Sequence, residues 1–518
     1  MNILLATYWP FPHIGGVSTY LHILRSRLEE AGHQVEILAQ HPDLLQYYLV
    51  GRGQLLEKQS LLKQAESEVR NDFQRRNIPL SPWMLWRESE KYAFELACRQ
   101  LLIGDYDLIH TQDIISTFVC RKAMPEHIPL VATIHGCLAS EWTANHEIKA
   151  RSPLEQHYLS LEEYFGSMSP DCLILPSRWL SNRLSTFDIN HPRSYIIPYG
   201  LNQESYQGRF NSGDLQPMTV SSVENKKMII ACPARLVAIK GQKYLLEAMK
   251  LLVEKHDNVV CWFIGDGVMR QDLELQTSEL KLTEHVHFFG KRHDVPELLA
   301  KADIVVLPSL QDNLPFSIIE AHSLGKPVVA SRIGGIVEMV QDGTNGLLAE
   351  PANAYDLYEK LLMLVENDRL REQQSKAAKE HACSVWSDMA MLQQTLEVYE
   401  QAAQMQSPLL NHDFASKLAQ SYKEDTKMGE ISSPSVTTLS GTISDGWTGK
   451  PIHDAHVHLL DMAGVVLRST TSSMSGKFEI RCLQPGNYEL GFSAMGLGMK
   501  TRKIRVHSSD PIQIEVMI

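Results

Sequence analysis

The chain has 518 residues, of which 44% are hydrophobic and 21% charged, and its formal net charge is −12. One hydrophobic core cannot organise this length, so we expect two large domains and a smaller one. The composition excludes disordered and fibrous proteins, and the negative charge argues against nucleic-acid binding, which needs a basic face against the phosphates.

The first residues, MNILLATYWPFPHIGG, carry no basic leader, and Pro10 and Pro12 soon break their apolar run, so we expect no signal peptide. No apolar run approaches the roughly 20 residues that cross a bilayer. The eight cysteines stand singly, without the Cys-x-x-Cys spacing of zinc or redox sites, and predict buried thiols in a reducing compartment. We expect a cytoplasmic protein and leave open a peripheral contact with the inner membrane face.

In chain order, residues 3–7 predict a strand, a Pro/Gly loop follows, and residues 17–31 predict a helix that ends at Gly32. The next strand, over residues 34–38, completes a beta-alpha-beta order, which builds parallel sheets. Residues 44–76 are rich in Leu, Gln, Glu and Lys and predict a helix with a solvated face; a lid, a partner surface or a membrane-facing stretch are the alternatives. Further strands are expected over residues 108–110, 130–134, 172–175 and 194–197.

Residues 211–225 are polar and aperiodic, as linkers are. A second series of strands and helices then repeats the plan of the first, with strands in MIIACPAR, VVCWFIGDG, HVHFFG, ADIVVLPS and PVVAS. Ligands bind doubly wound sheets at the carboxyl ends of their strands, so two such sheets that face each other leave a binding cleft between them.

The last part of the chain has a different pattern of hydrophobic and polar residues. Short alternating segments such as SGTISD, AHVHLLD and GKFEIRC lie between turn residues at the spacing of a small beta sandwich. His456 and His458 share one face of a predicted strand, but no third metal ligand is evident, and we interpret them as a solvated face. Trp447 could stack on a sugar ring, whereas Tyr488 and Phe492 alternate as core residues do.

The segment PSLQDNLPFSIIEAHSLGKPVVAS carries two acidic residues eight positions apart, Asp312 and Glu320, around a helix expected to begin near Phe316. The first turn of a helix presents unpaired backbone N–H groups, which suit phosphate oxygens and sugar hydroxyls. Glu320 can accept hydrogen bonds from a ribose. By itself, an acidic pair around a helix start is more often a capping arrangement.

Two further loops favour an anion site. ARLVAIKGQKYLLEA places Arg235 and Lys240 after the first strand of the second series, where two cations can hold a diphosphate. HIGGVSTY places Gly15 and Gly16 before a helix, where backbone amides can approach an anion. Each pattern is weak alone, because loop cations are usually solvated and many helices follow a glycine.

His135 ends a strand and precedes a glycine, at the edge of the sheet where ligands bind; a structural and a functional role are both open. In this order, the motifs resemble those of the family 4 glycosyltransferases, which adopt the GT-B fold. The similarity covers about the first 400 residues, through the glycine loop, ATIHG, IIPYGLN, ARLVAIKGQ, FIGDGVMRQDLE, FFGKRHDVPELLAKADIVVLPS, the acidic pair and DGTNGLLAEP. The C-terminal segments resemble the carboxypeptidase regulatory-like beta-sandwich domains, which implies an accessory that docks a glycan or a protein.

The expected fold class is therefore α/β, with two facing Rossmann-like domains followed by a small all-β sandwich. The expected parts are an acceptor-side domain over residues 1–205, a donor domain over 206–382, a helix over 383–405 that packs back on the first domain, a linker over 406–435 and the sandwich over 436–518.

The resemblance also implies roles for individual residues. Arg235 and Lys240 would bind the donor diphosphate, Glu320 would hold the nucleotide ribose, and Asp312 with nearby amides would grip the donor sugar. His135 would contact the transferred sugar from across the cleft. The catalytic residues are then His135, Arg235, Lys240 and Asp312, and the substrate-binding residues are Gly15, Gly16, Asn313, Leu314, Pro315, Phe316 and Glu320.

The sequence departs from the family pattern at three places. Asp312 stands where Glu is common, Asn-Leu-Pro replaces the Gly-Phe-Gly that usually follows, and Tyr199 stands where Asn is common in IPNG.

We expect a retaining glycosyltransferase that moves a sugar from a nucleotide sugar, with a UDP-sugar favoured, to a glycan, lipid or small-molecule acceptor. No metal or other cofactor is expected, because two cations and helix-end amides can neutralise the leaving diphosphate. The alternatives are a nucleotide-sugar epimerase or a glycosyl phosphorylase on the same fold, or a non-catalytic carbohydrate-binding scaffold.

Overall fold

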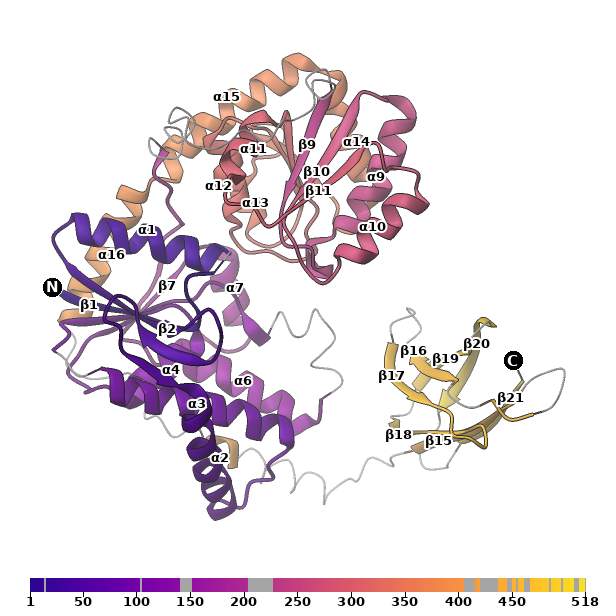
Figure 1. Cartoon of the computed structure of the whole chain (residues 1–518), viewed down its shortest axis with the longest axis horizontal. Helices are drawn as coiled ribbons and strands as arrows, with labels where there is room; N and C mark the ends of the chain where they lie inside the picture. The colour runs from indigo at the N-terminus through magenta and orange to yellow at the C-terminus, as the bar shows by residue number, and fades with distance from the viewer. Residues whose placement is uncertain are drawn as a thin grey trace. The chain divides into compact units, whose positions relative to one another are not determined.

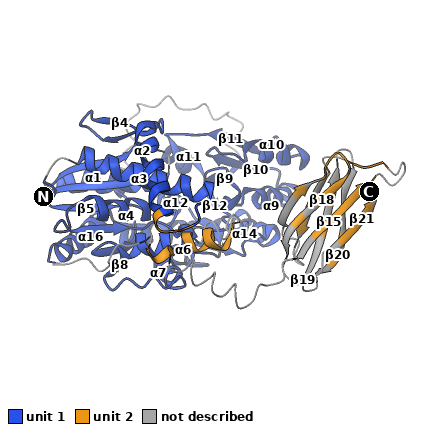
Figure 2. Cartoon of the chain, turned by 90° about the horizontal axis from the view of Figure 1, so that it is seen from below, with its two compact units in different colours: residues 1–74, 79–144, 159–414 blue, residues 75–78, 145–158, 415–518 orange. Residues whose placement is uncertain are grey.

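The computed structural model describes residues 1–13, 15–102, 105–139, 151–203, 227–404, 414, 416–419, 437–444, 450–452, 455–460, 466–483, 486–494, 497–506 and 512–517. The chain divides into two compact units, coloured separately in Figure 2. Unit 1 comprises Met1–Gln74, Pro79–Ala144 and Leu159–Phe414, and unit 2 comprises Arg75–Ile78, Asn145–Tyr158 and Ala415–Ile518. The predicted linker over residues 211–225 and Trp447 lie outside the described residues.

Unit 1 contains two sheets (Figure 1), and we call the parts built on them the N-terminal lobe and the C-terminal lobe. The N-terminal lobe has eight strands in the order β4-β3-β2-β1-β5-β6-β7-β8, and the six strands of the series β2-β1-β5-β6-β7-β8 pair in parallel. The strands are β1 (Asn2–Pro10), β2 (Gln34–Gln40), β3 (Gln46–Leu49), β4 (Leu55–Glu57), β5 (Leu108–Thr111), β6 (Leu130–Thr133), β7 (Cys172–Leu175) and β8 (Ser194–Ile196). The helices are α1 (Gly16–Glu30), α2 (Lys58–Arg75), α3 (Pro82–Leu101), α4 (Ile114–Ala123), α6 (Pro153–Met168) and α7 (Arg178–Ser185).

Strand β1 shows why this sheet has two covered faces. Its side chains alternate between two hydrophobic clusters: Ile3 and Leu5 pack in the cluster that holds Leu24 of α1, whereas Leu4 packs with Phe94 of α3. Successive side chains of a strand point to opposite faces, so a strand that is apolar throughout must be buried on both. Helices on both faces follow from this pattern.

The prediction of one helix over residues 44–76 is wrong in its first part. There, β3 and β4 form an antiparallel hairpin that extends the sheet beyond β2. β3 buries Tyr47 and Leu49 on one face, in the alternation of a strand. Gly51 and Gly53, in the turn, have φ angles of 94° and 67°, which a right-handed helix cannot contain. The helix α2 begins only at Lys58.

The C-terminal lobe has an all-parallel sheet in the order β11-β10-β9-β12-β13-β14. In Figure 1, α9, α10 and α14 lie on one side of this sheet and α11, α12 and α13 on the other. The strands are β9 (Met228–Pro233), β10 (Val259–Ile264), β11 (Val286–Gly290), β12 (Ile304–Leu307), β13 (Val328–Ser331) and β14 (Gly346–Ala349). The helices are η4 (Ala238–Lys240), α9 (Gln242–Lys255), α10 (Arg270–Glu279), α11 (Val295–Lys301), α12 (Phe316–Ser323), α13 (Ile336–Met339), α14 (Ala354–Glu366) and α15 (Asp368–Val385).

The chain crosses between the lobes twice, and the two crossings touch. After α15, helix α16 (Asp388–Ala403) lies against the N-terminal lobe: Arg27 Nε is 2.7 Å from Asp388 Oδ2. The first crossing, after β8, binds the second, because the Leu201 N–H donates to the Trp386 carbonyl at 2.9 Å. A Cβ at Gly200 would lie 2.4 Å from the Cα of Asp388, so only glycine allows this approach.

The C-terminal part of unit 2 is a small sandwich of two sheets, β18-β15-β21 and β17-β16-β19-β20. Both sheets contribute to one core, for example Leu439 and Ile443 from β15 and Phe492 from β19. Phe492 is thus a core residue, as predicted. The strands are β15 (Thr437–Ser444), β16 (His456–Leu460), β17 (Val466–Thr471), β18 (Lys477–Leu483), β19 (Gly486–Ala494), β20 (Leu497–Val506) and β21 (Ile512–Met517). The side chains of His456, His458 and Tyr488 lie outside the described residues.

Among the described helices, none has the length and apolar content to span a bilayer. Six of the described cysteines are buried free thiols, and Cys383 is an exposed one.

Candidate functional site

Arg235 and Lys240 lie between β9 and α9, at the carboxyl edge of the C-terminal sheet. The Arg235 side chain is exposed and has no hydrogen bond or ion pair with any residue that the structure describes. Gly241, which ends η4, has a φ of 67°, and a Cβ there would lie 2.0 Å from the Pro308 carbonyl oxygen. The loop therefore packs directly on the one that carries the acidic pair.

Lys240 and Asp312 form an ion pair in which Nζ lies 2.5 Å from Oδ2. The two side chains retain 16% and 13% of their accessible surface. The Ser309 hydroxyl also donates to the same carboxylate oxygen, at 3.0 Å. The structure thus joins two residues that the sequence placed in separate loops, and each balances the other's charge.

Two glycines, Gly334 and Gly335, pack against the loop of residues 312–315, which we call the acidic loop. Gly334 has a φ of 55°, and a Cβ there would lie 1.8 Å from the Asp312 carbonyl oxygen. The next N–H, from Gly335, donates to that oxygen at 3.3 Å. This contact requires glycine at position 334, and nothing in the local sequence pattern predicts it.

No side chain that the structure describes caps the start of helix α12, and neither Asp312 nor Glu320 forms the capping arrangement that an acidic pair often makes. Pro315 precedes the helix, and the side chains of Leu314 and Phe316 are buried. The Ile318 N–H donates to the Pro315 carbonyl at 3.1 Å, whereas those of Phe316 and Ser317 have no acceptor among the described residues. The start of the helix also carries the positive end of the helix dipole.

Glu320 lies on the second turn of α12. Its carboxylate has no hydrogen bond or ion pair with the residues that the structure describes, and burial raises its pKa to about 7. A hydroxyl that donated to this group would favour its ionised form. Glu320 is therefore an open acceptor beside a helix start that offers only donors.

Asn313 connects this loop to the N-terminal lobe. Its Nδ2 donates to the His135 carbonyl oxygen at 3.0 Å, and its Oδ1 accepts from the Ser177 hydroxyl. Glu338 of α13 makes a second connection, since its carboxylate accepts from the backbone N–H groups of Arg178 and Trp179 at 3.1 and 2.6 Å. Those N–H groups begin α7, where a carboxylate is favoured.

His135 is held by the protein on both ring nitrogens. Nδ1 lies 2.7 Å from the Tyr199 hydroxyl and Nε2 lies 3.2 Å from Gln112 Oε1. Burial lowers the pKa of His135 to about 3, so the imidazole is neutral at physiological pH. Acid–base chemistry by this ring is disfavoured, and its contact with a sugar stays a prediction.

The glycine loop of the N-terminal lobe faces the start of α12. Gly15 is the N-terminal cap of α1 and offers no side-chain hydrogen bond, so no described side chain caps the first N–H groups of α1. A Cβ on Gly16 would lie 3.4 Å from the Phe316 ring. His13 lies near enough to Arg235 for that charge to help burial lower the pKa of the imidazole. Within the described part of the chain, two helix starts without side-chain caps and a cation without an ion-pair partner thus lie near one another, which suits a polyanion.

Sequence reasoning missed Tyr199 as a partner of His135, and it missed Gln112, Ser177 and Glu338 altogether. None of them belongs to a motif with a chemical signature. Their contacts join segments that are far apart along the chain. Among the described residues, no three His, Cys, Asp or Glu side chains gather where they could hold a metal ion.

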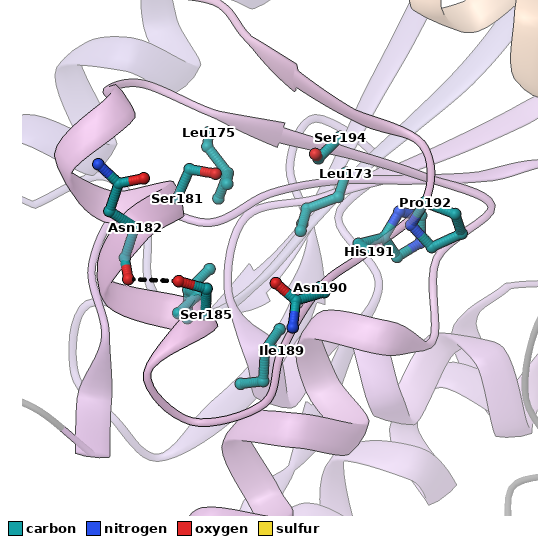
Figure 3. Close-up of a pocket in the computed structure, with 11 residues that line it drawn as sticks. Leu173, Leu175, Ser181, Asn182, Ser185, Ile189, Asn190, His191, Pro192 and Ser194 are labelled. Atoms are coloured by element: carbon teal, nitrogen blue, oxygen red, sulfur yellow. Dashed lines mark hydrogen bonds between the residues drawn. The ribbon is translucent and has the colours of Figure 1, made fainter.

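A cavity of about 470 Å³ lies between α7 and the β7–β8 edge of the N-terminal sheet (Figure 3). Its lining combines apolar side chains such as Leu173 and Leu184 with polar ones such as Asn182, Asn190 and Ser194. None of the predicted site residues lines it.

Family comparisons match both lobes. Residues 14–205 match the family model described as Glycosyltransferase Family 4, and residues 218–381 match the model described as Glycosyl transferases group 1. Together they cover about two thirds of the chain and every predicted site residue. The chain belongs to the GT-B glycosyltransferases. Residues 438–518 of this glycosyltransferase match the Carboxypeptidase regulatory-like domain, so both family resemblances are confirmed.

Among characterised relatives, the glycosyltransferase is 27% identical to the MMP alpha-(1->4)-mannosyltransferase of Mycolicibacterium hassiacum, over 78% of this chain and 98% of the relative. It is 27% identical to the UDP-Gal:alpha-D-GlcNAc-diphosphoundecaprenol alpha-1,3-galactosyltransferase of Escherichia coli, over 52% of this chain and 69% of the relative. The Anabaena protein HepE, solved in complex with UDP and glucose, superposes with a TM-score of 0.55 and 20% identity over 77% of this chain and 100% of HepE. This last likeness confirms the GT-B fold, and the matches do not favour the epimerase, phosphorylase or scaffold alternatives.

Proposed function

We propose that the protein is a retaining glycosyltransferase that moves a sugar from a UDP-sugar to an acceptor bound against the N-terminal lobe. The observation that carries this proposal is that Arg235 follows β9, and the start of α12 and Glu320 follow β12, on neighbouring strands of the C-terminal sheet. Among the described residues, neither side chain has a hydrogen-bond or ion-pair partner and α12 has no side-chain cap. The Escherichia coli relative is named for a UDP-galactose donor, and HepE was solved with UDP, which supports uridine as the base.

Each group then has a role in donor binding. The diphosphate lies against Arg235, Lys240 and the first N–H groups of α12, because fixed donors and a helix dipole stabilise anions. The ribose hydroxyls donate to Glu320, the open acceptor. Asp312 and the adjacent backbone grip the donor sugar while Lys240 balances the carboxylate.

In the reaction, the bond between the anomeric carbon and the diphosphate oxygen breaks as the acceptor oxygen bonds to that carbon on the same face. The acceptor proton passes to the leaving diphosphate oxygen. Negative charge grows on that diphosphate, where Arg235 and the α12 amides stabilise it in the transition state. His135 is neutral and hydrogen-bonded on both nitrogens, so its proposed contribution is a contact with the sugar.

Because these groups supply positive charge at the diphosphate, we propose that turnover needs no divalent metal and survives chelation by EDTA. The acceptor is a glycan, a lipid or a small molecule with a free hydroxyl. The carboxypeptidase regulatory-like domain would dock a glycan or a partner protein, which its deletion would test.

The first experiment is a thermal-shift screen of the full chain against nucleotide sugars, because a ligand of the folded state raises its melting temperature. The donor so found is then incubated with candidate acceptors, and the anomeric configuration of the product is determined by NMR. Product formed without acceptor would indicate an epimerase, and product formed only with phosphate would indicate a phosphorylase.

Arg235→Ala is the decisive variant. We expect a loss of about 100-fold or more in kcat/KM, because the group acts on charge that develops in the transition state. Arg369→Ala, which removes an exposed arginine from α15, is the matched control. Undiminished turnover by Arg235→Ala would refute the assignment.

A further inference from the structure

Tyr199 stands at the point where the two lobes meet, on the first crossing between them. The crossing is held firmly: Leu201 donates to the Trp386 carbonyl of the second crossing, and the Gly200 N–H contacts the Met391 sulfur at 3.3 Å. The Tyr199 side chain is buried, with 6% of its surface exposed. Its ring therefore has little freedom to turn away from its neighbours.

The Tyr199 ring stacks on Phe316, the first residue of α12. Its centroid is 4.8 Å from that of Phe316, and the two planes differ by 6°, which is a parallel stack. Gly16 of the glycine loop touches the Phe316 ring as well, since a Cβ there would lie 3.4 Å from Phe316 Cδ2. Two segments of the N-terminal lobe thus set the position of the α12 start, where the Phe316 and Ser317 N–H groups have no acceptor among the described residues.

The Tyr199 hydroxyl sets the state of His135. Gln112 Nε2 donates to the His110 carbonyl at 3.3 Å, which directs Gln112 Oε1 toward His135 Nε2. His135 Nε2 therefore carries the proton, and Nδ1 accepts from the Tyr199 hydroxyl at 2.7 Å. Burial raises the pKa of Tyr199 well above its usual value, so the hydroxyl keeps the proton that it donates.

The main chain of His135 faces the same loop as the Phe316 stack, because its carbonyl accepts from Asn313 Nδ2 at 3.0 Å. One side chain thus holds two elements of opposite lobes: the ring of Tyr199 holds the α12 start, and its hydroxyl holds the residue that contacts Asn313. Both depend on the lobes being in the arrangement seen here.

We propose that Tyr199 is a positioning residue that aligns His135 with the acidic loop, residues 312–315, when the lobes close. This inference rests on the proposed function. It assigns the hydroxyl to the catalytic step, through the orientation of His135, and the ring to donor binding, through the α12 start. Asn at this position could not make the stack.

The test separates ring from hydroxyl in the full-length protein. Tyr199→Phe keeps the stack and removes the hydrogen bond, and should lower kcat about tenfold with the donor KM within about twofold, the effect of one buried hydrogen bond. Tyr199→Leu removes both, and should also raise the donor KM. Tyr355→Phe, at an exposed tyrosine of α14, is the control.

An NMR measurement of the imidazole nitrogens distinguishes positioning from a general structural role, with the His135 signal assigned from its absence in His135→Asn. The Tyr199 donor opposes protonation of Nδ1, so Tyr199→Phe should raise the pKa of His135 from about 3 and free its tautomer. A double variant, Tyr199→Phe with His135→Asn, should lose no more kcat than His135→Asn alone.

Unchanged kcat in Tyr199→Phe, or additive losses in the double variant, would overturn the inference. If Tyr199→Leu does not fold, Tyr199→Phe still decides the matter. A wild-type protein that neither binds nor turns over any nucleotide sugar would instead refute the proposed function, and the NMR titration would still test the Tyr199–His135 link.

Discussion

Lys240 Nζ lies 2.5 Å from Asp312 Oδ2, and both side chains are mostly covered by protein. Removing either partner therefore leaves a charge that water reaches poorly, which costs more than the loss of an exposed pair. The pair also links the loop after β9 to the acidic loop. Removing either residue is therefore expected to displace both loops and to weaken donor binding.

We therefore predict that Lys240→Ala and Asp312→Ala each lower the free energy of unfolding by about 2 kcal/mol and lower donor affinity. The double variant should be no less stable than either single one, because neither charge is then left alone. Urea unfolding of the four proteins measures this coupling. Strictly additive losses would show that the pair makes no energetic contribution.

Glu320 should make donor binding pH-dependent. Burial holds its pKa near 7, and ribose hydroxyls that donate to it favour the ionised form. The affinity for a UDP-sugar should therefore rise with pH up to about 7 and level off above it, falling about tenfold per unit below. A UDP-sugar is used rather than UDP, since a terminal phosphate titrates near pH 6.

Calorimetric titration between pH 5.5 and 8.5 measures this dependence. Glu320→Gln should bind more weakly and lose most of the pH dependence, and an unchanged profile in that variant would exclude Glu320 from the ribose site. The same raised pKa means that the folded state keeps a proton that the unfolded chain has lost, so Glu320's contribution to stability falls as pH rises from about 4.5 to 7.

Gly334→Ala should displace the acidic loop. Its φ of 55° disfavours a side chain, and the added Cβ would lie 1.8 Å from the Asp312 carbonyl oxygen. We expect a loss of about 3 kcal/mol in unfolding free energy and a large drop in donor affinity. Gly343→Ala is the matched control, because its φ is 82° but no atom of the described residues lies within 4 Å of its added Cβ. Equal losses in both variants would assign the effect to backbone strain alone.

Glu338 should favour the arrangement of the lobes seen here, because its carboxylate accepts two N–H groups at the start of α7. Glu338→Ala should raise the donor KM several-fold and increase the radius of gyration by small-angle scattering, with melting temperature little changed. Glu284→Ala, at an exposed position of the C-terminal lobe, provides the control. A variant with wild-type scattering and KM would show that the contact does not hold the lobes.

Much of the fold could be predicted because its signals are local. The fully apolar runs of β9, β10 and β12 identify buried parallel strands, and the glycine loop before α1 marks a helix start. The hairpin of β3 and β4 escaped prediction because four-residue and three-residue strands carry too few positions to show their period. Only pairing with β2 decides their conformation.

The residue types of the donor site are visible in the sequence by themselves: Arg235, Lys240, Asp312 and Glu320 lie in or beside loops at the carboxyl ends of predicted strands. Their relations depend on tertiary structure. Lys240 and Asp312 pair across 72 positions, and Phe316 stacks on Tyr199 from the other lobe. The physical reason is that periodicity and turn chemistry act within a few residues, whereas charge pairing, stacking and burial act through space, between segments that only the packed sheets bring together.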